Sequence, residues 1–289
     1  MKTPELITDP AAWQARCTAA REAGTRIALV TTMGYLHEGH LSLMREARRR
    51  ADAGGRRGLA VGTIFVNPTQ FGPTEDLARY PRDLEGDLAK CAAAGLDAVL
   101  APSDPALMFA PGHETWVTVE RASQGLDGAS RPGHFRGVAT VVAKLFNLTR
   151  PHVALFGEKD WQQLAVIRAM VRDLAFGIEI VGMPIVREPD GLALSSRNAY
   201  LSPDERRRAL ALSGALAEAR EATARGERDA AALRAGARAR LEAAGGRVDY
   251  VELVHPETLA PVARAEPGTV LLLAASFGTT RLIDNGRLP

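Results

Sequence analysis

The sequence has little cysteine, almost no net charge and no long apolar run, and each absence excludes a class of protein. Cys17 and Cys91 lie far apart and lack the spaced partners that a disulfide framework or a zinc site requires. The 36 basic and 34 acidic residues nearly cancel, so the basic excess typical of nucleic-acid binding is missing. No run approaches the ~18 consecutive apolar residues of a membrane-spanning helix, and residues 1–10 lack the apolar segment of a signal peptide. We therefore expect a cytoplasmic protein with no nucleic-acid or membrane partner.

The composition that remains is typical of a globular protein. Apolar residues make up 46% and charged residues 24% of 289 residues, enough for two domains of ordinary size. The short arginine runs at 48–50, 56–57 and 206–208 are interpreted as solvated faces or helix C-terminal charges. Cys91 lies in an apolar helical pattern, which favours a small core residue over a nucleophile.

The chain up to residue 184 alternates strand-like and helix-like segments. Apolar runs typical of strands occur at 27–31, 59–66, 98–101, 116–119, 153–156 and 178–181. Apolar residues at helical spacing occur at 41–53, 84–91, 138–148 and 164–174, and Gly95 marks a helix stop. This alternation predicts an α/β domain with a parallel sheet and right-handed crossovers.

The pattern changes after Pro184. Ser202, Pro203 and Glu205 form a capping box that starts an alanine- and arginine-rich helix reaching about Arg225. A second helix runs to residues 245–246, and strand-like runs follow at 248–254 and 269–274. We therefore predict a smaller α+β domain in the C-terminal part.

The segment from Thr32 to His40 follows the first predicted strand and opens the first predicted helix. His37 and His40 are three residues apart, so they lie near one face of a forming helix, and Gly34 and Gly39 let the backbone approach a ligand. Two imidazoles beside free helix N–H groups can stabilise negative charge on a phosphate. The structural alternative is one satisfied polar histidine and one surface histidine. Zinc is disfavoured because no third ligand stands at a familiar spacing.

Two further segments follow predicted strands or open predicted helices. Gln70, after the second strand, offers both a donor and an acceptor for a hydroxyl or carboxylate, although a lone loop glutamine is usually a surface residue. Arg131 and Arg136 lie in a loop shaped by glycine and proline and can face an anion, or simply belong to a solvated turn.

Charged and hydroxyl side chains occur again at residues 157–163 and 195–197. Lys159 suits a phosphate, and Gln163 lies on the same side of the following helix. Asp160 either caps that helix or holds a ribose or metal. Ser195, Ser196 and Arg197 are suited to clamp a β,γ-phosphate, after an Asp190–Gly191 hairpin-turn signal; a purely structural turn is the alternative.

Together these segments resemble the pantothenate synthetase (pantoate–β-alanine ligase) family of the His-x-Gly-His nucleotidyltransferase superfamily. The shared motifs are His37-x-Gly-His40 and residues 67–71, 157–160 and 195–198, in the family's order. His-x-Gly-His alone also occurs in adenylyltransferases and class I tRNA synthetases, whereas the combination is specific. The resemblance implies a Rossmann-like ATP/pantoate-binding domain over residues 1–184, a smaller C-terminal α+β lid domain over 185–289, and a homodimer.

The resemblance also implies an activity and its residues. The reaction is the ATP-dependent condensation of (R)-pantoate with β-alanine to pantothenate, AMP and pyrophosphate through a pantoyl adenylate, with Mg²⁺. Catalytic roles are implied for His37, His40, Lys159 and Arg197. ATP contacts are implied for Met33, Gly34, Tyr35, Leu36, His37, Glu38, Gly39, His40, Gly157, Glu158, Lys159, Asp160, Val186, Leu194, Ser195, Ser196 and Arg197. Gln70 and Gln163 are implied as pantoate contacts, and Gln70 also as a β-alanine contact.

The chain departs from the family's pattern at several positions. Thr32 stands where proline is usual, Tyr35 where a small residue is common, Trp161 where tyrosine is usual and Leu194 where methionine is usual. The expected metal region, residues 83–87, is less acidic than in some members, so no direct side-chain ligand is assigned and Asp87 is the one candidate.

Two other functions compete with this interpretation. One is an adenylyltransferase that leaves AMP on a phosphorylated acceptor, which Gln70 and Gln163 disfavour because such an acceptor needs basic groups. The other is a non-catalytic nucleotide-binding module, which the set of His37, His40, Lys159 and Arg197 disfavours.

Overall fold

The computed structural model describes residues 3–73 and 75–289, and the chain divides into two compact units. Unit 1 extends to Glu158 and includes Val166–Pro184; unit 2 comprises Lys159–Ala165 and Ile185–Pro289. The predicted domain boundary after residue 184 stays a prediction, because the short segment Lys159–Ala165 groups with the later residues. Among the described residues, no helix has both the length and the apolar character needed to cross a membrane.

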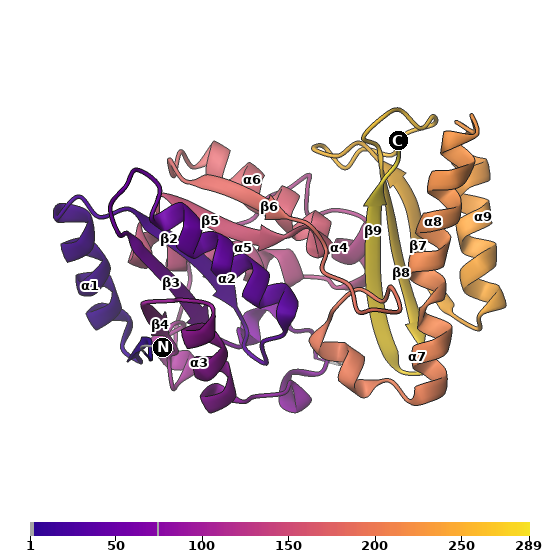
Figure 1. Ribbon diagram of the computed structural model, residues 1–289. Coiled ribbons are helices and arrows are strands. Elements are labelled where there is room, and N and C mark those ends of the chain that lie inside the picture. Colours follow the sequence, from indigo (N-terminus) through magenta and orange to yellow (C-terminus); the bar gives the residue numbers. More distant parts are fainter. Residues whose placement is uncertain (1–2, 74) are drawn as a thin grey trace. The chain divides into compact units, whose positions relative to one another are not determined.

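Unit 1 is built on a six-stranded parallel sheet, as the alternation of strands and helices predicts (Figure 1). The strand order is β1-β4-β3-β2-β5-β6. The strands are β1 (Glu5–Ile7), β2 (Ile27–Thr32), β3 (Leu59–Ile64), β4 (Ala98–Leu100), β5 (Val153–Gly157) and β6 (Glu179–Met183). Thr32 pairs with Ile64, so β2 and β3 end side by side and the segments that follow them leave the same edge of the sheet.

Helices cover both faces of this sheet. They are α1 (Pro10–Glu22), α2 (Glu38–Ala51), α3 (Leu84–Ala93), α4 (Leu126–Ser130), α5 (His134–Thr149) and α6 (Trp161–Asp173). Short 3₁₀ turns are η1 (Pro68–Gln70), η2 (Leu77–Arg79), η3 (Pro105–Leu107) and η4 (Glu158–Asp160). Met44 of α2 and Cys91 of α3 pack in one cluster with Ala28 and Val30 of β2. Ile27 and Leu29 alternate with these strand residues and are also fully buried, so both faces of β2 are covered.

Two parts of unit 1 differ from the sequence prediction. Residues 116–119, predicted as a strand, are not one: the Val117 N–H donates to Thr140 Oγ1 of α5 (3.0 Å), and the Arg136 guanidinium lies 4.2 Å from the Trp116 ring centroid. The Thr140 side chain thus accepts the hydrogen bond that the Val117 N–H would donate to a neighbouring strand in a sheet. In addition, β1 and α1, which lie before the first predicted strand, are absent from the prediction.

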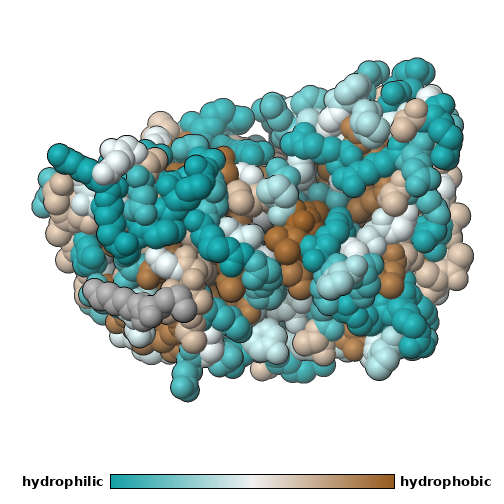
Figure 2. Space-filling view, in the orientation of Figure 1, coloured by the Kyte–Doolittle hydropathy of each residue, from teal (hydrophilic) through white to brown (hydrophobic). Residues whose placement is uncertain are grey.

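The arginines at 48–50 lie in the last turn of α2, as interpreted from the sequence. Arg48 pairs with Asp52 and, at 2.5 Å, with Asp97, while Arg50 pairs with Glu46 at 2.7 Å. Figure 2 shows a largely hydrophilic surface in this region. These arginines therefore form local ion pairs at the C-terminal end of α2.

Both cysteines are free thiols in the core of unit 1. Cys17 and Cys91 are 1% and 0% exposed, and burial raises the pKa of each thiol to about 12. Thiols held protonated in this way are poor nucleophiles, which agrees with the interpretation of Cys91 as a core residue.

Unit 2 carries a three-stranded antiparallel sheet of order β7-β8-β9, with α8 and α9 lying against it (Figure 1). Its elements are η5 (Ser196–Tyr200), α7 (Pro203–Ala209), α8 (Ala211–Ala224), α9 (Ala230–Ala243), β7 (Arg247–Val254), β8 (Val270–Phe277) and β9 (Thr280–Arg287). Every residue of β8 is buried, since β8 is central in the sheet and its apolar side chains contribute to the core under α8 and α9. β9 was not predicted from the sequence.

The predicted helix start in unit 2 is confirmed. Glu205 N donates to Ser202 Oγ at 3.2 Å and Ser202 N donates to Glu205 Oε2 at 2.8 Å, which completes the capping box. The helix predicted to reach Arg225 is divided at Leu210 into α7 and α8.

Candidate active site

The turn between β2 and α2 is held by one buried carboxylate. Asp87 of α3 is 1% exposed and accepts hydrogen bonds from the backbone nitrogens of Tyr35 and Leu36, both at 2.7 Å. Gly34 has φ +87°, and a β-carbon there would lie 3.0 Å from Asp87 Oδ2, so glycine suits this turn for both reasons. Tyr35, in place of the usual small residue, also has a positive φ of 51°.

This turn delivers two imidazoles to the start of α2. His40 N donates to His37 O at 2.8 Å, and His37 N donates to His40 Nδ1 at 3.3 Å. The two ring centroids are 4.1 Å apart. The predicted pairing of His37 and His40 on one face at a helix N-terminus is therefore present, in a geometry suited to an anion.

Met33 and Gln70 meet beside this turn, although they follow different strands. Gln70 Nε2 donates to Met33 Sδ at 3.2 Å, and Asn67 Nδ2 donates to Gln70 Oε1 at 3.0 Å. Gln70 is 9% exposed, so it is not the surface residue that a loop glutamine usually is. Gly137 of α5 packs so closely that a β-carbon there would lie 2.3 Å from Thr69 O. Backbone packing and two side-chain contacts thus fix Gln70.

The Arg131–His134 segment supports Gln70 from its backbone side. His134 Nδ1 lies 2.8 Å from Gln70 O, and Arg131 Nη1 lies 3.0 Å from His134 Nε2. Because arginine only donates, Nε2 is the acceptor and Nδ1 carries the proton that Gln70 O accepts. Arg131 is itself paired with Glu75 at 2.5 Å. The arginine suggested as an anion contact is therefore engaged in a structural ion pair.

His134 is held as a neutral imidazole. Burial, followed by the positive charge of Arg131, lowers the pKa of His134 from 6.5 to about 4. The neutral form matches the hydrogen bonds, since Nε2 must keep its lone pair to accept from Arg131.

Gly157 ends β5 and Glu158 begins η4, both in unit 1, whereas Lys159, Asp160 and Gln163 belong to unit 2. Lys159 O accepts a hydrogen bond from Asn285 Nδ2 of β9 at 2.8 Å. Trp161, the residue that replaces tyrosine, donates through Nε1 to Pro256 O at 3.0 Å, and the Arg287 guanidinium lies 4.7 Å from its ring centroid. Asp160 is exposed and Gln163 is half-buried.

Residues 186–194 form a hairpin that leads through Ser195 into η5, where Ser196 and Arg197 lie. Leu194 N donates to Val186 O at 3.0 Å, and Gly191 has the left-handed conformation that the Asp190–Gly191 signal predicts. Ser195 caps η5 by accepting from Arg197 N at 3.3 Å. Val186, Leu194, Ser195, Ser196 and Arg197 are all partly buried and lie on this one piece of unit 2.

Three residues organise these segments in ways that the sequence did not predict. Asp284 of β9 binds the Arg187 guanidinium, and Asn285 of the same strand binds the backbone oxygen of Lys159. Asp87, suggested as a metal ligand, binds the backbone of the β2–α2 turn. The sequence suggests Asp87 only as a candidate metal ligand, and nothing local in the sequence links it to Tyr35 or Leu36. Within residues 3–73 and 75–289, no group of three or more His, Cys, Asp or Glu side chains is arranged to hold a metal ion.

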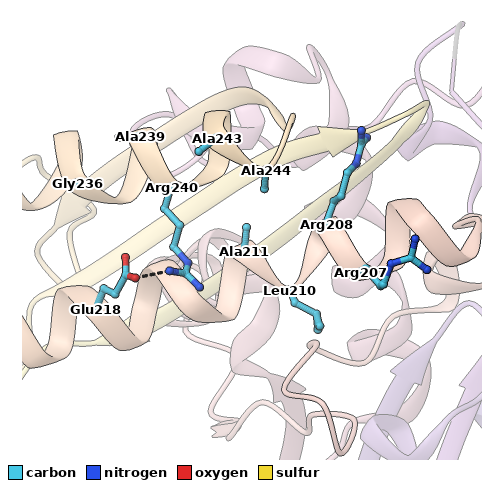
Figure 3. A pocket seen from close by; sticks show the side chains of 10 residues that line it. All are labelled: Arg207, Arg208, Leu210, Ala211, Glu218, Gly236, Ala239, Arg240, Ala243 and Ala244. Carbon is cyan, nitrogen blue, oxygen red and sulfur yellow. Dashed lines mark hydrogen bonds and ion pairs between the residues drawn. The ribbon is translucent and has the colours of Figure 1, made fainter.

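A cavity of about 680 Å³ lies between α7, α8 and α9 in unit 2, and its walls include Arg207, Arg208, Arg240 and Glu218 (Figure 3). Arg240 pairs with Glu218 across it, and Arg207 pairs with Asp204 at 2.9 Å. None of the predicted site residues lines this cavity. Its positive charge is largely compensated, so it does not compete with the segments above as the candidate site.

Comparison with known proteins yields one consistent family. The family model described as pantoate-beta-alanine ligase matches residues 5–287. The chain is 61% identical to a pantothenate synthetase of Myxococcus xanthus, over 98% of this chain and 95% of that protein. A solved pantothenate synthetase of Thermus thermophilus aligns with a TM-score of 0.90 at 46% identity, over 99% of this chain and all of that one. A Francisella tularensis pantoate-beta-alanine ligase, solved with beta-gamma ATP and beta-alanine, aligns with a TM-score of 0.81 at 28% identity, over 98% and 97% of the two chains.

Proposed function

The chain belongs to the pantoate-beta-alanine ligase family, and we propose that it condenses (R)-pantoate with β-alanine, consuming ATP and giving pantothenate, AMP and pyrophosphate. The observation that carries the proposal is the extent of the family match, which covers residues 5–287 rather than the His-x-Gly-His segment alone. A match confined to that segment would fit adenylyltransferases equally well.

The chemistry proceeds in two steps. Pantoate, whose carboxyl pKa is about 4, is ionised at neutral pH and needs no general base to attack the α-phosphorus of ATP. The carboxylate oxygen bonds to the α-phosphorus, and the bond from that phosphorus to the oxygen that bridges to the β-phosphate breaks. Pyrophosphate leaves with the bonding electrons, and pantoyl adenylate stays bound. The amine of β-alanine then attacks the acyl carbon, AMP leaves with its bonding electrons, and the amine loses a proton as the amide forms.

The protein's task in the first step is to bring two anions together. We assign His37 and His40, at the N-terminus of α2, to the charge that grows on the α-phosphate. Lys159 and Arg197, which both belong to unit 2, are assigned to the leaving phosphates. The other residues of 33–40, with Gly157, Glu158, Asp160, Val186, Leu194, Ser195 and Ser196, are assigned to ATP binding.

Gln70 and Gln163 are assigned to pantoate, and Gln70 also to β-alanine. Gln70 is the better supported, because its amide is oriented by Asn67 and Met33 before any substrate arrives. Each amide group has capacity for more than one hydrogen bond, so these contacts leave room for a ligand.

Magnesium is expected to accompany ATP rather than to occupy a protein site. The described residues offer no three-ligand acidic or histidine cluster, and both carboxylate oxygens of Asp87 bind backbone N–H groups. Mg²⁺ commonly binds substrate phosphates with few protein ligands. The donor set thus does not form a dedicated site, and Asp87 is better assigned to the turn.

Product analysis tests the proposal. The purified protein is incubated with ATP, pantoate, β-alanine and Mg²⁺, and the products are identified by mass spectrometry with each substrate omitted in turn. We expect pantothenate and free AMP only in the complete mixture, and pantoyl adenylate with pyrophosphate when β-alanine is left out. An adenylylated end product would support an adenylyltransferase instead, and ATP binding without pyrophosphate release would support a non-catalytic module.

We also propose a cytoplasmic homodimer. The localisation follows from the expected biosynthetic role, and the dimer follows from the family resemblance. Light scattering on the purified chain, whose monomer mass is 30.9 kDa, tests the dimer directly.

A further inference from the structure

Two adjacent residues of β9, Asp284 and Asn285, contact two separate candidate active-site segments. The Asn285 amide donates to the backbone oxygen of Lys159 at 2.8 Å. The Asp284 carboxylate accepts from Arg187 Nη1 at 2.7 Å and from Nη2 at 2.9 Å. Both residues are buried, at 2% and 4% exposure, although they are polar and lie on an edge strand.

The contact of Asp284 reaches the hairpin that leads into η5, the short helix in which Arg197 lies. Arg187 is held by both carboxylate oxygens, and its Nη1 also donates to Gly191 O at 3.0 Å, in the hairpin turn. A two-point arginine–carboxylate contact fixes orientation as well as distance. Beyond the turn, Asn198 Nδ2 donates to Ala193 O at 3.1 Å, which ties the hairpin to η5.

The contact of Asn285 fixes the turn before α6. Lys159 is the central residue of η4, and a hydrogen bond to its carbonyl oxygen restricts the backbone from which the ammonium projects. Arg287, two residues further along β9, lies over the Trp161 ring. The same strand therefore supports the start of α6 at two points.

β9 is a rigid base for these contacts. Asp284 and Asn285 pair in unbroken antiparallel register with Leu273 and Leu272 of the fully buried β8. Successive residues of a strand are spaced by roughly 3.3 Å along its axis, so the two anchor points keep a fixed separation. A buried carboxylate is weak evidence for a purely stabilising role, because its desolvation offsets much of what the ion pair gains.

We propose that Asp284 and Asn285 are positioning residues for adenylate formation, because they fix the Lys159 backbone relative to the hairpin that leads into η5 and its Arg197. This inference rests on the proposed function. Neither residue is assigned a contact with substrate; each acts through the segment that it holds. Their loss should lower the rate of the first step while leaving the amine-transfer step nearly unchanged.

A double-mutant cycle on Asn285 and Lys159 tests the first contact. Single-turnover pyrophosphate release at saturating ATP and pantoate is measured for the unmodified protein, Asn285→Leu, Lys159→Ala and the double variant. We expect Asn285→Leu to slow release roughly 10-fold when Lys159 is present and less than about 2-fold in the Lys159→Ala background, since coupled residues are not additive. The same fall in both backgrounds, or no fall in either, overturns the inference for Asn285.

The second contact is tested in the same way through Arg197. Arg187→Lys keeps the positive charge but loses the two-point contact. It is therefore the second variant of this ion pair, and it disturbs folding less than Asp284→Asn. Both should slow pyrophosphate release when Arg197 is present and have little further effect in an Arg197→Ala background. If Asp284→Asn does not fold, the test rests on Arg187→Lys. An equal fall in the rate of pyrophosphate release with Arg197 present and with Arg197→Ala overturns the inference for Asp284.

The matched control is Asp249→Asn. Asp249 of β7 forms an ion pair with Arg281 of β9 at 2.7 Å, so this pair joins two strands of the same sheet rather than a strand and an active-site segment. The rate of pyrophosphate release by Asp249→Asn should stay within about 2-fold of that of the unmodified protein, as expected for an ion pair that is open to solvent. An unmodified protein that releases no pantoate-dependent pyrophosphate refutes the proposed function itself, whereas an active protein with additive cycles refutes only the positioning role.

Discussion

Asp87 Oδ2 accepts a hydrogen bond from the backbone nitrogen of Tyr35 at 2.7 Å, although the two residues lie 52 positions apart in the chain. The other carboxylate oxygen binds the next backbone nitrogen, that of Leu36, at the same distance. The turn that leads to His37 is therefore shaped by a side chain from α3 rather than by its own residues alone.

Replacing Asp87 with asparagine should damage both stability and the first reaction step. One acceptor becomes an N–H group facing a backbone N–H, and an unsatisfied buried group costs about 1–3 kcal/mol. Urea denaturation should show that loss, and single-turnover pyrophosphate release should slow as His37 loses its placement. Asp83→Asn is the control, because Asp83 caps the same helix through Gly86 N and asparagine caps equally well. Equal behaviour of the two variants would refute the role given to Asp87.

His37→Ala and Lys159→Ala should each lower the rate of adenylate formation by roughly 10²-fold or more, the scale of losing one transition-state donor. Pyrophosphate release in a single turnover measures that step without the amine transfer. His255→Ala, at an exposed histidine in unit 2, should leave the rate within about 2-fold, as for most surface substitutions. Unchanged rates in both variants would reject these catalytic assignments.

Two helical glycines should respond in opposite ways to alanine. At Gly137 the new β-carbon would lie 2.3 Å from Thr69 O and 2.7 Å from Gln70 N, so backbone must move. We expect Gly137→Ala to lose about 1–3 kcal/mol of stability and to raise the KM for pantoate through Gln70. At Gly236 no atom beyond its chain neighbours and the adjoining helix backbone lies within 4 Å of the added carbon, and Gly236→Ala should gain about 0.5–1 kcal/mol. Denaturation midpoints and pantoate kinetics distinguish the two; a pantoate KM that Gly137→Ala leaves unchanged argues against the placement of Gln70.

His134 should make stability depend on pH between about 4 and 6.5. Its pKa is about 4 in the folded protein and near 6.5 when unfolded, so in this window the unfolded chain binds more protons and folding weakens as pH falls. The neutral His134 contributes about 3 kcal/mol to the free energy of unfolding above pH 6.5, and this contribution is lost by pH 4. Urea denaturation at several pH values should show a shallower dependence for His134→Asn, which keeps a donor toward Gln70 O but does not titrate. Glu75, Arg131 and Asp127, the charged groups that act on His134, are unchanged in the variant, so parallel curves would contradict the assignment.

The sequence predicts the centre of the fold better than its edges. β2, β3 and β5 are apolar runs buried on both faces, a pattern that is visible without any tertiary information. The sequence pattern does not predict β9, because Asp284, Asn285 and Gly286 interrupt its apolar residues. The two polar side chains are explained only by partners far away in the chain. In α1, the apolar face of Trp13, Cys17 and Ala20 is hidden in a run of alanine and charged residues.

The candidate site divides in the same way. His37 and His40 are predictable because a strand-to-helix turn with two glycines is a local pattern. Arg131 is the opposite case: a loop arginine suggests an anion contact, yet Glu75, 56 positions away, already binds it. Local residue types indicate where chemistry is available, whereas the buried groups that hold them in place depend on long-range packing.

The helix α6 begins in one unit and ends in the other, since Lys159–Ala165 groups with unit 2 and Val166–Pro184 with unit 1. Unit 2 is therefore not one contiguous segment of the chain. A fragment cut after residue 184 would take away the carbonyl that Asn285 binds and the indole that Arg287 covers. Transplanting the C-terminal part between relatives, or expressing it alone, would thus separate it from seven of its own residues, among them Lys159.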